Sequence, residues 1–388
     1  MIRYKSATID RRLAATSAGA KWPFARVTDA PPVTEYREGK RRLHITGMRG
    51  ELFHICSSLD ARYICCSTHV FAPVSNCPFE CTYCFLQNYL TNGTTLLLGD
   101  TGAVMAEIEE KTALEPWRFF RIGTWELGDS IAVPPVTDVA AGLVKRFSRM
   151  PNALLKLRTK GRIVEPLLDI DHRGRTVISW TVNPEEVISR EEAGTASMAG
   201  RIEAMKRASD AGYPVGLHFD PMIWFPGWED AYNRLVDAIY NVMRPEDIIW
   251  ISIGSLRFNP EMKMTMENNY PASRITSAEM VLGDDNKYRY VRPLRAWMYR
   301  HLLERLEQHG ACSSFVYLCM ERWNMWDDLF DDYPESIGEL DFRMTHYLYR
   351  RYPGLVHCRP ERELYLKAGK VAEGTRGGNR KMPENCLT

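Results

Sequence analysis

The stretch Val74-Ser-Asn-Cys77-Pro-Phe-Glu-Cys81-Thr-Tyr-Cys84-Phe-Leu-Gln87 carries three cysteines in the spacing C-x3-C-x2-C. Thiolates are soft ligands that suit zinc or iron–sulfur clusters, and so short a loop can surround only one inorganic centre. Three ligands are one too few for a closed tetrahedral zinc site, whereas a four-iron cluster held by three cysteines keeps one iron open to a small molecule. The missing fourth ligand therefore points to a reactive cluster.

Two other interpretations of this loop stay open. The loop would form a zinc site if Cys65, Cys66 or a histidine supplied the fourth ligand, or its cysteines would simply be buried without a metal. Zinc sites more often show two C-x-x-C-like pairs than one triplet, so the spacing favours the cluster.

Composition limits the class of protein. A chain of 388 residues that is 45% hydrophobic can form one α/β barrel with appendages. The formal net charge is only +1, so nucleic-acid binding would depend on a local basic face. The N-terminus lacks the apolar core of a signal peptide, and no apolar run approaches the ~20 residues that span a bilayer, which predicts a cytoplasmic protein with no membrane partner. Ten cysteines in such a chain indicate reduced thiols and metal ligands.

Short β-branched or aromatic runs alternate with amphipathic helical patterns, which predicts βαβ units and a parallel sheet. The expected strands are Thr68–Pro73, Phe119–Gly123, Leu154–Arg158, Val177–Val182, Val215–Phe219, Ile248–Ile253 and Phe315–Leu318, and the expected helices include Met105–Leu114, Val136–Arg149, Ser197–Ala211, Tyr232–Met243 and Pro293–Gln308. We expect a barrel over residues 61–320, an extended N-terminal arm over 1–60, and a C-terminal helical extension and tail over 321–388. The tail would be disordered from residue 369 onward.

The cysteine spacing, with Tyr83 just before the third cysteine, resembles the radical S-adenosylmethionine superfamily. More narrowly, Cys81-Thr-Tyr-Cys84-Phe-Leu-Gln87 is similar to the C-x-Y-C-Y-L-Q segment of the spore photoproduct lyase family, and the similarity runs from about Arg41 to about Leu306. The resemblance implies an α/β fold, a partial, TIM-like (β/α)6 barrel. It also implies a 4Fe-4S cluster on Cys77, Cys81 and Cys84, S-adenosyl-L-methionine at the open iron, and an electron donor such as flavodoxin or ferredoxin.

Ligands of parallel barrels bind at the C-terminal ends of the strands, and the resemblance gives residues there a role with the cofactor. Tyr83 belongs to the cysteine motif. Glu126, in a G-x-x-E-type turn, would accept hydrogen bonds from ribose hydroxyls, and Lys160 would pair with the methionyl carboxylate. The other expected cofactor contacts are Thr181 and Asn183, in a segment similar to the family's S-I-N, and Asp220, which stands where the family has alanine.

A β-hairpin is predicted within residues 272–292, and its second strand alternates basic and aromatic residues. In the resembled lyases a hairpin in this region wedges into DNA at the lesion. The expected phosphate contacts are therefore Arg257, Arg274, Arg289 and Arg292. The alternative is an ordinary edge hairpin protected by its charges. A second basic cluster, Arg26, Arg37, Lys40, Arg41, Arg42 and Arg49, is interpreted as a solvated surface.

The resemblance implies reductive cleavage of S-adenosylmethionine to a 5′-deoxyadenosyl radical. This radical would abstract hydrogen from a thymine photoproduct in DNA, and a cysteine would return hydrogen to the product. Two positions depart from the family. Gly123-Thr-Trp-Glu126 has no thiol where the family has C-T-S-D, and Phe85 replaces a tyrosine. Cys319, at the end of the last expected strand, is the candidate substitute thiol and, with Tyr83, an expected catalytic residue.

The departures leave two further functions open. A radical enzyme of the same fold would act on a peptide or metabolite, or the protein would be a non-catalytic metal-binding or DNA-binding relic.

Overall fold

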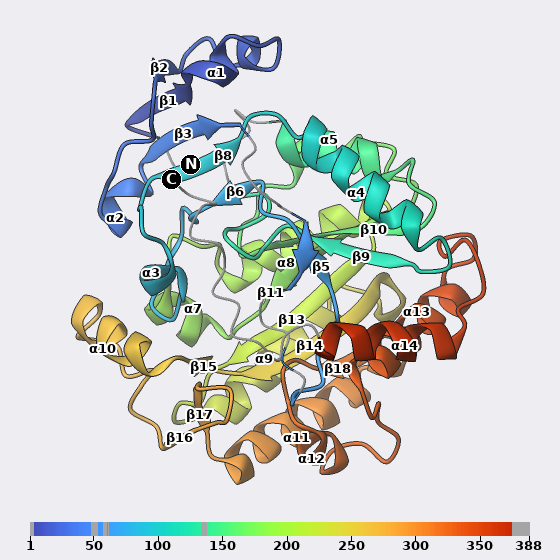
Figure 1. Ribbon diagram of the computed structural model, residues 1–388. Helices are drawn as coiled ribbons and strands as arrows, with labels where there is room; N and C mark the ends of the chain where they lie inside the picture. The colour runs from blue at the N-terminus through green and yellow to red at the C-terminus, as the bar shows by residue number, and fades with distance from the viewer. Residues whose placement is uncertain (1–3, 48–52, 57–59, 61, 133–137, 375–388) are drawn as a thin grey trace.

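The computed structural model describes residues 4–47, 53–56, 60, 62–132 and 138–374 (Figure 1). Its helices are α1 (Arg11–Ala14), α2 (Tyr36–Gly39), α3 (Leu86–Tyr89), α4 (Gly102–Leu114), α5 (Val139–Phe147), α6 (Glu165–Leu168), α7 (Glu185–Glu191), α8 (Met198–Asp210), α9 (Trp228–Tyr240), α10 (Pro260–Asn269), α11 (Arg292–Gln308), α12 (Trp323–Asp327), α13 (Ile337–Arg351) and α14 (Arg362–Gly374). Short 3-10 turns lie at Gly19–Lys21, Pro245–Asp247 and Ala311–Ser313.

The central element is an eight-stranded sheet with the order β18-β14-β13-β11-β10-β9-β5-β4. Its strands are β4 (His54–Ile55), β5 (His69–Val70), β9 (Phe120–Gly123), β10 (Ala153–Thr159), β11 (Thr176–Thr181), β13 (Val215–Met222), β14 (Ile248–Ser255) and β18 (Phe315–Leu318). All neighbours pair in parallel except β4 and β5, which are antiparallel. Every strand expected from the sequence is found, and the curled half-barrel confirms the predicted α/β barrel class.

The helices that connect these strands follow the predicted positions. Ser197 begins α8 by accepting a hydrogen bond from the Gly200 amide at 3.2 Å, and Gly212 ends it with a φ of 85°. The strands β11 and β14 are buried along their whole length because helices cover the sheet. No helix among the described residues is long and apolar enough to cross a membrane.

The two edges of the curled sheet are linked by residues outside the strands. The Ile64 amide donates to the Glu321 carbonyl at 2.9 Å in an antiparallel bridge. Helix α13, red in Figure 1, lies beside β9, where its Asp341 accepts from Arg118 at 2.9 Å and from Arg121 at 2.5 Å. Helix α14 reaches Gly374, so residues 369–374 are helical rather than disordered, and 375–388 lie outside the described residues.

The N-terminal region differs from the extended arm that we expected. Strands β1 (Ser6–Asp10), β2 (Arg26–Thr28), β3 (Arg42–Thr46), β6 (Val74–Ser75) and β8 (Thr95–Leu98) form a second sheet with the order β2-β1-β3-β8-β6. Its own hydrophobic cluster contains Ile9, Trp22, Ile45 and Leu97. Strands β6 and β8 precede and follow the cysteine loop in the chain, so this sheet supports the loop. The sheet also contains strands from both sides of residue 60, so the domain boundary that we expected there is not present.

The hairpin has shorter strands than predicted. Strands β16 (Met280–Leu282) and β17 (Tyr288–Tyr290) pair in antiparallel fashion, and β15 (Arg257–Phe258) joins the other side of β17. The Gly283 amide donates to the Lys287 carbonyl at 2.9 Å, which closes the turn.

Candidate active site

A cavity of about 480 Å³ opens at the carboxyl ends of the parallel strands. The cysteine loop forms one part of its wall, and residues at or just after the ends of β9, β10, β11, β13 and β14 form another. These lining residues include Cys77, Cys81, Tyr83, Cys84, Trp125, Glu126, Arg158, Lys160, Thr181, Asp220 and Ser255. Parallel barrels bind their ligands at this edge, so the structure brings together most of the site residues expected from the sequence.

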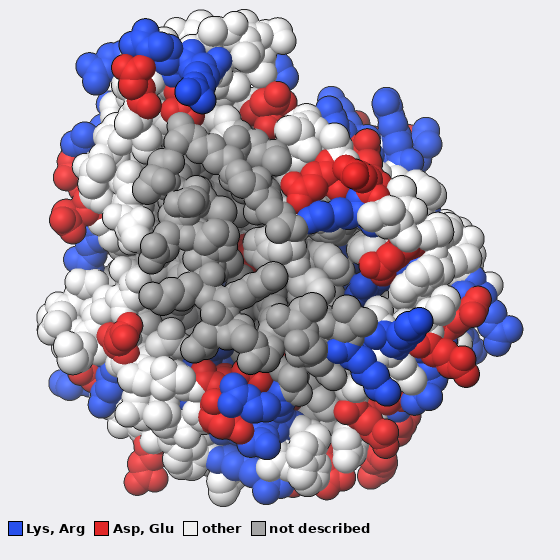
Figure 2. All heavy atoms as spheres, viewed as in Figure 1, with Lys and Arg blue, Asp and Glu red and all other residues white. Residues whose placement is uncertain are grey.

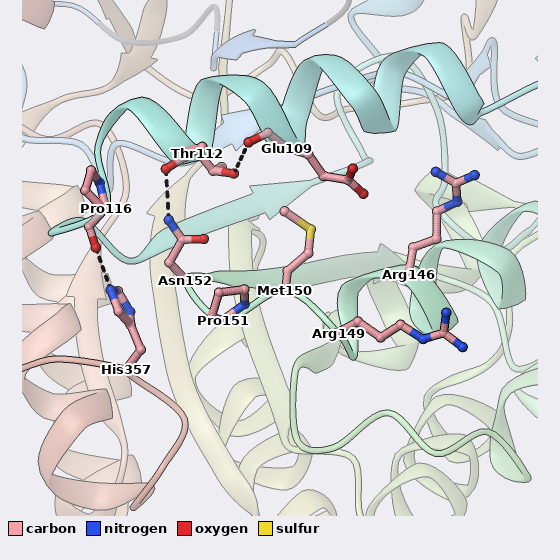
Figure 3. Close-up of a pocket in the computed structure, with 10 residues that line it drawn as sticks. Glu109, Thr112, Pro116, Arg146, Arg149, Met150, Pro151, Asn152 and His357 are labelled. Carbon is pink, nitrogen blue, oxygen red and sulfur yellow. Dashed lines mark hydrogen bonds between the residues drawn. The ribbon is translucent and has the colours of Figure 1, made fainter.

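A second cavity, of about 670 Å³, lies at the amino ends of the parallel strands (Figure 3). Glu109 and Thr112 of α4, Asn152 just before β10, and His357 line it, and the Asn152 side-chain amide donates to the Thr112 carbonyl at 3.0 Å. The amino ends of barrel strands serve stability rather than catalysis, so we assign no chemistry to this cavity.

The cysteine loop is shaped by its neighbours in the second sheet. Asn76 has a φ of 70°, and its side-chain oxygen accepts from the Cys77 amide at 2.8 Å. Strand β7 (Glu80–Cys81) pairs with β12 (Glu192–Ala193), which puts Glu192 opposite Cys81. Burial raises the pKa of the Cys81 thiol to about 12. Burial therefore favours the protonated form of Cys81 until a metal centre replaces the proton.

The cysteines fit a multi-iron cluster better than a single zinc ion. A zinc site gathers its ligands at about 2.0–2.3 Å around one point. Cys65 instead packs with Met320 and Ile337. Three thiols on the wall of one cavity suit a cluster in which separate irons each take one thiolate.

A buried charge network joins the cysteine loop to the barrel. Tyr83 donates its hydroxyl hydrogen to Glu192, which also accepts from Asn183 at 2.8 Å and from Arg201 at 2.5 Å. The Lys160 ammonium lies 3.0 Å from the Tyr83 hydroxyl and 3.8 Å from Glu192. Burial opposes ionisation of Glu192, but Lys160 and Arg201 lower its pKa to about 2. Glu192 is thus an ionised residue that fixes the positions of Tyr83 and Lys160. The sequence analysis missed Glu192 because its partners Tyr83 and Lys160 lie far from it in the chain.

Asn183 lies outside the cavity wall. It is fully buried, and its side-chain oxygen accepts from Tyr232 at 3.0 Å. Its amide group is therefore committed to the network around Glu192, and the direct cofactor contact expected for Asn183 does not fit this position. Thr181, by contrast, lines the cavity and accepts from the Arg158 Nε at 3.0 Å.

Asp220 takes part in a second charge cluster. Its carboxylate lies 3.0 Å from Arg257 and 3.9 Å from Arg158. Burial would raise the pKa of Asp220, but the two guanidinium groups lower it below its usual value. Asp220 is therefore an ionised residue of the cavity wall, and its charge explains why Arg257 turns toward the barrel instead of toward solvent.

The loop after β9 packs against Gly123, where the resemblance led us to look for a thiol. A β-carbon on Gly123 would meet the Trp125 ring at 1.6 Å, so the indole occupies the space that a side chain would need. Glu126 lies on the cavity wall, where its carboxylate is 2.8 Å from the His54 Nε2. Asp129 accepts from the backbone amides of Ala132 and Lys160 at 2.9 and 2.8 Å, so it holds the loop in place.

Two thiols stand near the cavity besides the three of the motif. Cys319 lies 3.5 Å from a guanidinium nitrogen of Arg257, and burial raises the pKa of its thiol. Cys319 is not on the cavity wall, whereas Cys56 is. The Cys56 amide donates to the Thr68 carbonyl at 3.0 Å, so Cys56 follows His54 on the same side of β4. The sequence signal for Cys56 was its alternation with His54, which puts both side chains on one side of the strand. Because β4 has only two residues, this alternation is too short to be recognised in the sequence.

The four arginines expected at a nucleic acid occupy different environments. Arg289 is 4% exposed and pairs with Asp285 at 2.8 Å, so an outward phosphate contact does not fit it. Arg257 is held by Asp220, and Arg292 pairs with Asp328 at 2.6 Å, while Arg274 is exposed. Figure 2 shows positive and negative side chains mixed over the described part of the visible face. Three of the four arginines are therefore already paired with a carboxylate, Arg289 within the hairpin and Arg257 and Arg292 outside it.

The comparisons with known proteins agree on one family. A family model described as spore photoproduct lyase matches residues 21–307. The spore photoproduct lyase of Bacillus subtilis (strain 168) is 25% identical over 289 residues, which are 73% of this chain and 80% of that protein. The spore photoproduct lyase of Geobacillus sp. (strain Y412MC61) is 26% identical over 301 residues, covering 75% and 84%.

Solved structures show the same fold. A spore photoproduct lyase double mutant with bound AdoMet and dinucleoside spore photoproduct superposes with a TM-score of 0.72 and 22% identity, over 81% of this chain and 98% of that one. A spore photoproduct lyase complexed with dinucleoside spore photoproduct gives 0.71 and 21%, over 82% and 99%.

Proposed function

We propose, from the premise that this chain belongs to the spore photoproduct lyase family, that it is a radical S-adenosylmethionine lyase that repairs a thymine photoproduct in DNA. The observation that carries the proposal is the three-cysteine motif on the wall of a cavity at the carboxyl ends of the barrel strands. The solved spore photoproduct lyase structures with bound AdoMet and dinucleoside spore photoproduct support both the cofactor and the substrate class.

In this proposal Cys77, Cys81 and Cys84 would hold the cluster, and the rest of the cavity wall would hold S-adenosylmethionine. When bound, the reduced cluster and S-adenosylmethionine supply the radical that abstracts hydrogen from the substrate. Lys160 and Glu126 are the proposed partners of the cofactor's carboxylate and ribose, and Thr181 and Asp220 complete the wall. Tyr83 and Asn183 would act through Glu192, which fixes their orientation.

The residue that returns hydrogen is proposed to be a cysteine outside the motif. After abstraction the product is a radical that needs one hydrogen atom, and a thiol S–H group supplies it while its sulfur becomes a thiyl radical. That thiyl radical would then take a hydrogen atom from an added thiol reductant, and two of the reductant's thiyl radicals would combine to a disulfide. Cys319 was the candidate from the sequence, and Cys56 joins it because it lines the cavity.

The test starts with anaerobic reconstitution using iron and sulfide, followed by dithionite reduction. We expect S-adenosylmethionine to yield 5′-deoxyadenosine, more so with ultraviolet-irradiated DNA, and to depend on all three motif cysteines. A colourless protein with stoichiometric zinc would contradict the proposal. Flavodoxin or ferredoxin in place of dithionite would test the physiological donor.

Matched Cys56→Ala and Cys319→Ala variants then test the return step in deuterated water, where thiols carry deuterium. The variant that lacks the donor should still form 5′-deoxyadenosine, while the repaired product loses its solvent deuterium. Unchanged labelling in both variants would exclude both thiols.

A second candidate function is radical chemistry of the same site on a peptide or metabolite. It is favoured by the missing thiol at Gly123 and by the carboxylate pairs that already engage Arg257, Arg289 and Arg292. Cleavage of S-adenosylmethionine that is indifferent to irradiated DNA would support this alternative.

A further inference from the structure

Lys40 contacts the backbone of the cysteine loop. We expected it on a solvated basic surface, but its side chain is only 2% exposed. Its ammonium donates to the carbonyl oxygens of Cys77 at 2.7 Å and Phe79 at 2.6 Å. It also contacts the Tyr36 hydroxyl at 3.1 Å and the Asn76 side-chain oxygen at 3.4 Å. Lys40 therefore ties the second sheet to the backbone of the motif.

All of these partners are uncharged. In the part of the chain that the structure describes, no carboxylate lies within 4.0 Å of the Lys40 ammonium. Lysine is almost never fully buried without a charge partner, because an unpaired ammonium loses its hydration. The protein thus keeps a buried positive charge next to the cysteine loop without supplying its counter-charge.

We propose that the iron–sulfur cluster is the counter-charge of Lys40, which is a positioning residue that also favours the reduced cluster. This inference rests on the proposed function. Three thiolates make the bound cluster anionic, and each added electron increases that negative charge. A cation held at a fixed place beside the loop attracts the more negative state more strongly. Charges and hydrogen bonds around a cluster set its reduction potential in this way.

The step concerned is the transfer of one electron from an external one-electron donor to the oxidised cluster. The donor is oxidised by one electron, the cluster is reduced by one, and no bond breaks. Lys40 neither gives nor takes a proton. It lowers the energy of the product of this step, and its hydrogen bonds to the carbonyls of Cys77 and Phe79 keep the loop in its cluster-binding shape.

The test compares Lys40→Gln, which keeps a donor but loses the charge, with Lys40→Arg, which keeps both. Lys21→Gln, at an exposed lysine of the same region, is the matched control. Each protein is reconstituted with iron and sulfide, assayed for iron, and titrated with dithionite while the reduced cluster is followed by electron paramagnetic resonance.

We expect Lys40→Gln to bind iron but to show at least a tenfold lower ratio of reduced to oxidised cluster at a fixed potential, which is about 59 mV for one electron. Lys40→Arg and Lys21→Gln should match the wild type. An unshifted Lys40→Gln, or an equal shift in Lys40→Arg, would overturn the inference.

A wild type that binds no cluster at all would instead overturn the proposed function. A second measurement does not depend on reconstitution. In the cluster-free protein, Lys40→Gln and Lys40→Arg both keep a hydrogen-bond donor but only Lys40→Gln loses the unpaired buried charge, so its Tm should exceed that of Lys40→Arg, and the reverse order would contradict the missing counter-charge.

Discussion

The two sides of the cavity handle charge differently. On the cysteine side, which comprises the Cys77–Cys84 loop with Lys160, Glu192 and Arg201, the charges come from segments far apart in the chain and are buried together. On the hairpin side, which comprises β15, β16 and β17, Arg289 pairs with Asp285 four residues away. The cysteine side is thus held by buried pairs between distant segments. The hairpin side combines a pair within its own turn with a longer-range one, because Arg257 of β15 reaches Asp220 of the barrel.

The largest effect on the cysteine side is expected from Glu192→Gln, which removes the carboxylate of its buried ion pair. The substitution leaves Arg201, which is 1% exposed, without its carboxylate. Removing one partner of a buried ion pair costs about 4 kcal/mol, and we expect that loss in the unfolding free energy measured with urea. The control is Glu186→Gln, whose pair with Arg234 is largely exposed and should change stability by less than about 0.5 kcal/mol. Equal effects of the two substitutions would contradict a buried network.

The same carboxylate predicts a pH dependence. The pKa of Glu192 is lowered from 4.5 to about 2, so its stabilisation is fully present above pH 4.5 and is lost as the pH falls through about 2. This shift corresponds to about 3 kcal/mol. The difference in unfolding free energy between wild type and Glu192→Gln should therefore shrink between pH 4.5 and pH 2. A difference that is constant over this range would exclude Glu192 as the titrating group.

The fold and the place of the cysteine motif at the barrel mouth could be predicted because their signals are local. Alternating strand and helix patterns gave all seven parallel strands, and the spacing of Cys77, Cys81 and Cys84 lies within one loop. Glu192, Cys56 and Lys40 could not be found in this way. Each reaches the cavity or the loop by pairing with a segment distant in the chain, such as β12 with β7, and no single-sequence pattern records that register.

The phosphate contact expected for Arg289 does not fit the structure, although the signal for its strand was local. Its basic and aromatic strand was read correctly, but a pattern gives no information on whether an arginine is already neutralised. The acidic turn Asp284-Asp285 was in view, yet only the structure shows that Asp285 reaches back to Arg289. The N-terminal region was misjudged similarly, because the partners of β1 and β3 include β8, well beyond the expected arm.

A comparison of Arg289→Ala with Arg274→Ala tests which arginines of the hairpin region stabilise the fold and which contact DNA. Arg289→Ala should cost about 2 kcal/mol of stability, less than Glu192→Gln because Lys287 still lies 3.9 Å from Asp285. It should leave the salt dependence of binding to irradiated DNA unchanged. Arg274→Ala should do the reverse, lowering the slope of log K against log salt by about 1 with little change in stability. Fluorescence anisotropy at several salt concentrations measures the slopes, and a reduced slope for Arg289→Ala would restore it as a phosphate contact.

Arg292→Ala should have the smallest effect. Arg292 pairs with Asp328 at 2.6 Å, but the two side chains are 49% and 29% exposed, so solvent screens the pair. We expect a loss of about 0.5 kcal/mol at low salt and none at 1 M salt, where the screening length is about 3 Å. A double-mutant cycle with Asp328→Ala isolates the pair, and the coupling should vanish at 1 M salt. A coupling that persists there would mean that the pair is shielded from water and fixes the start of α11 against the end of α12.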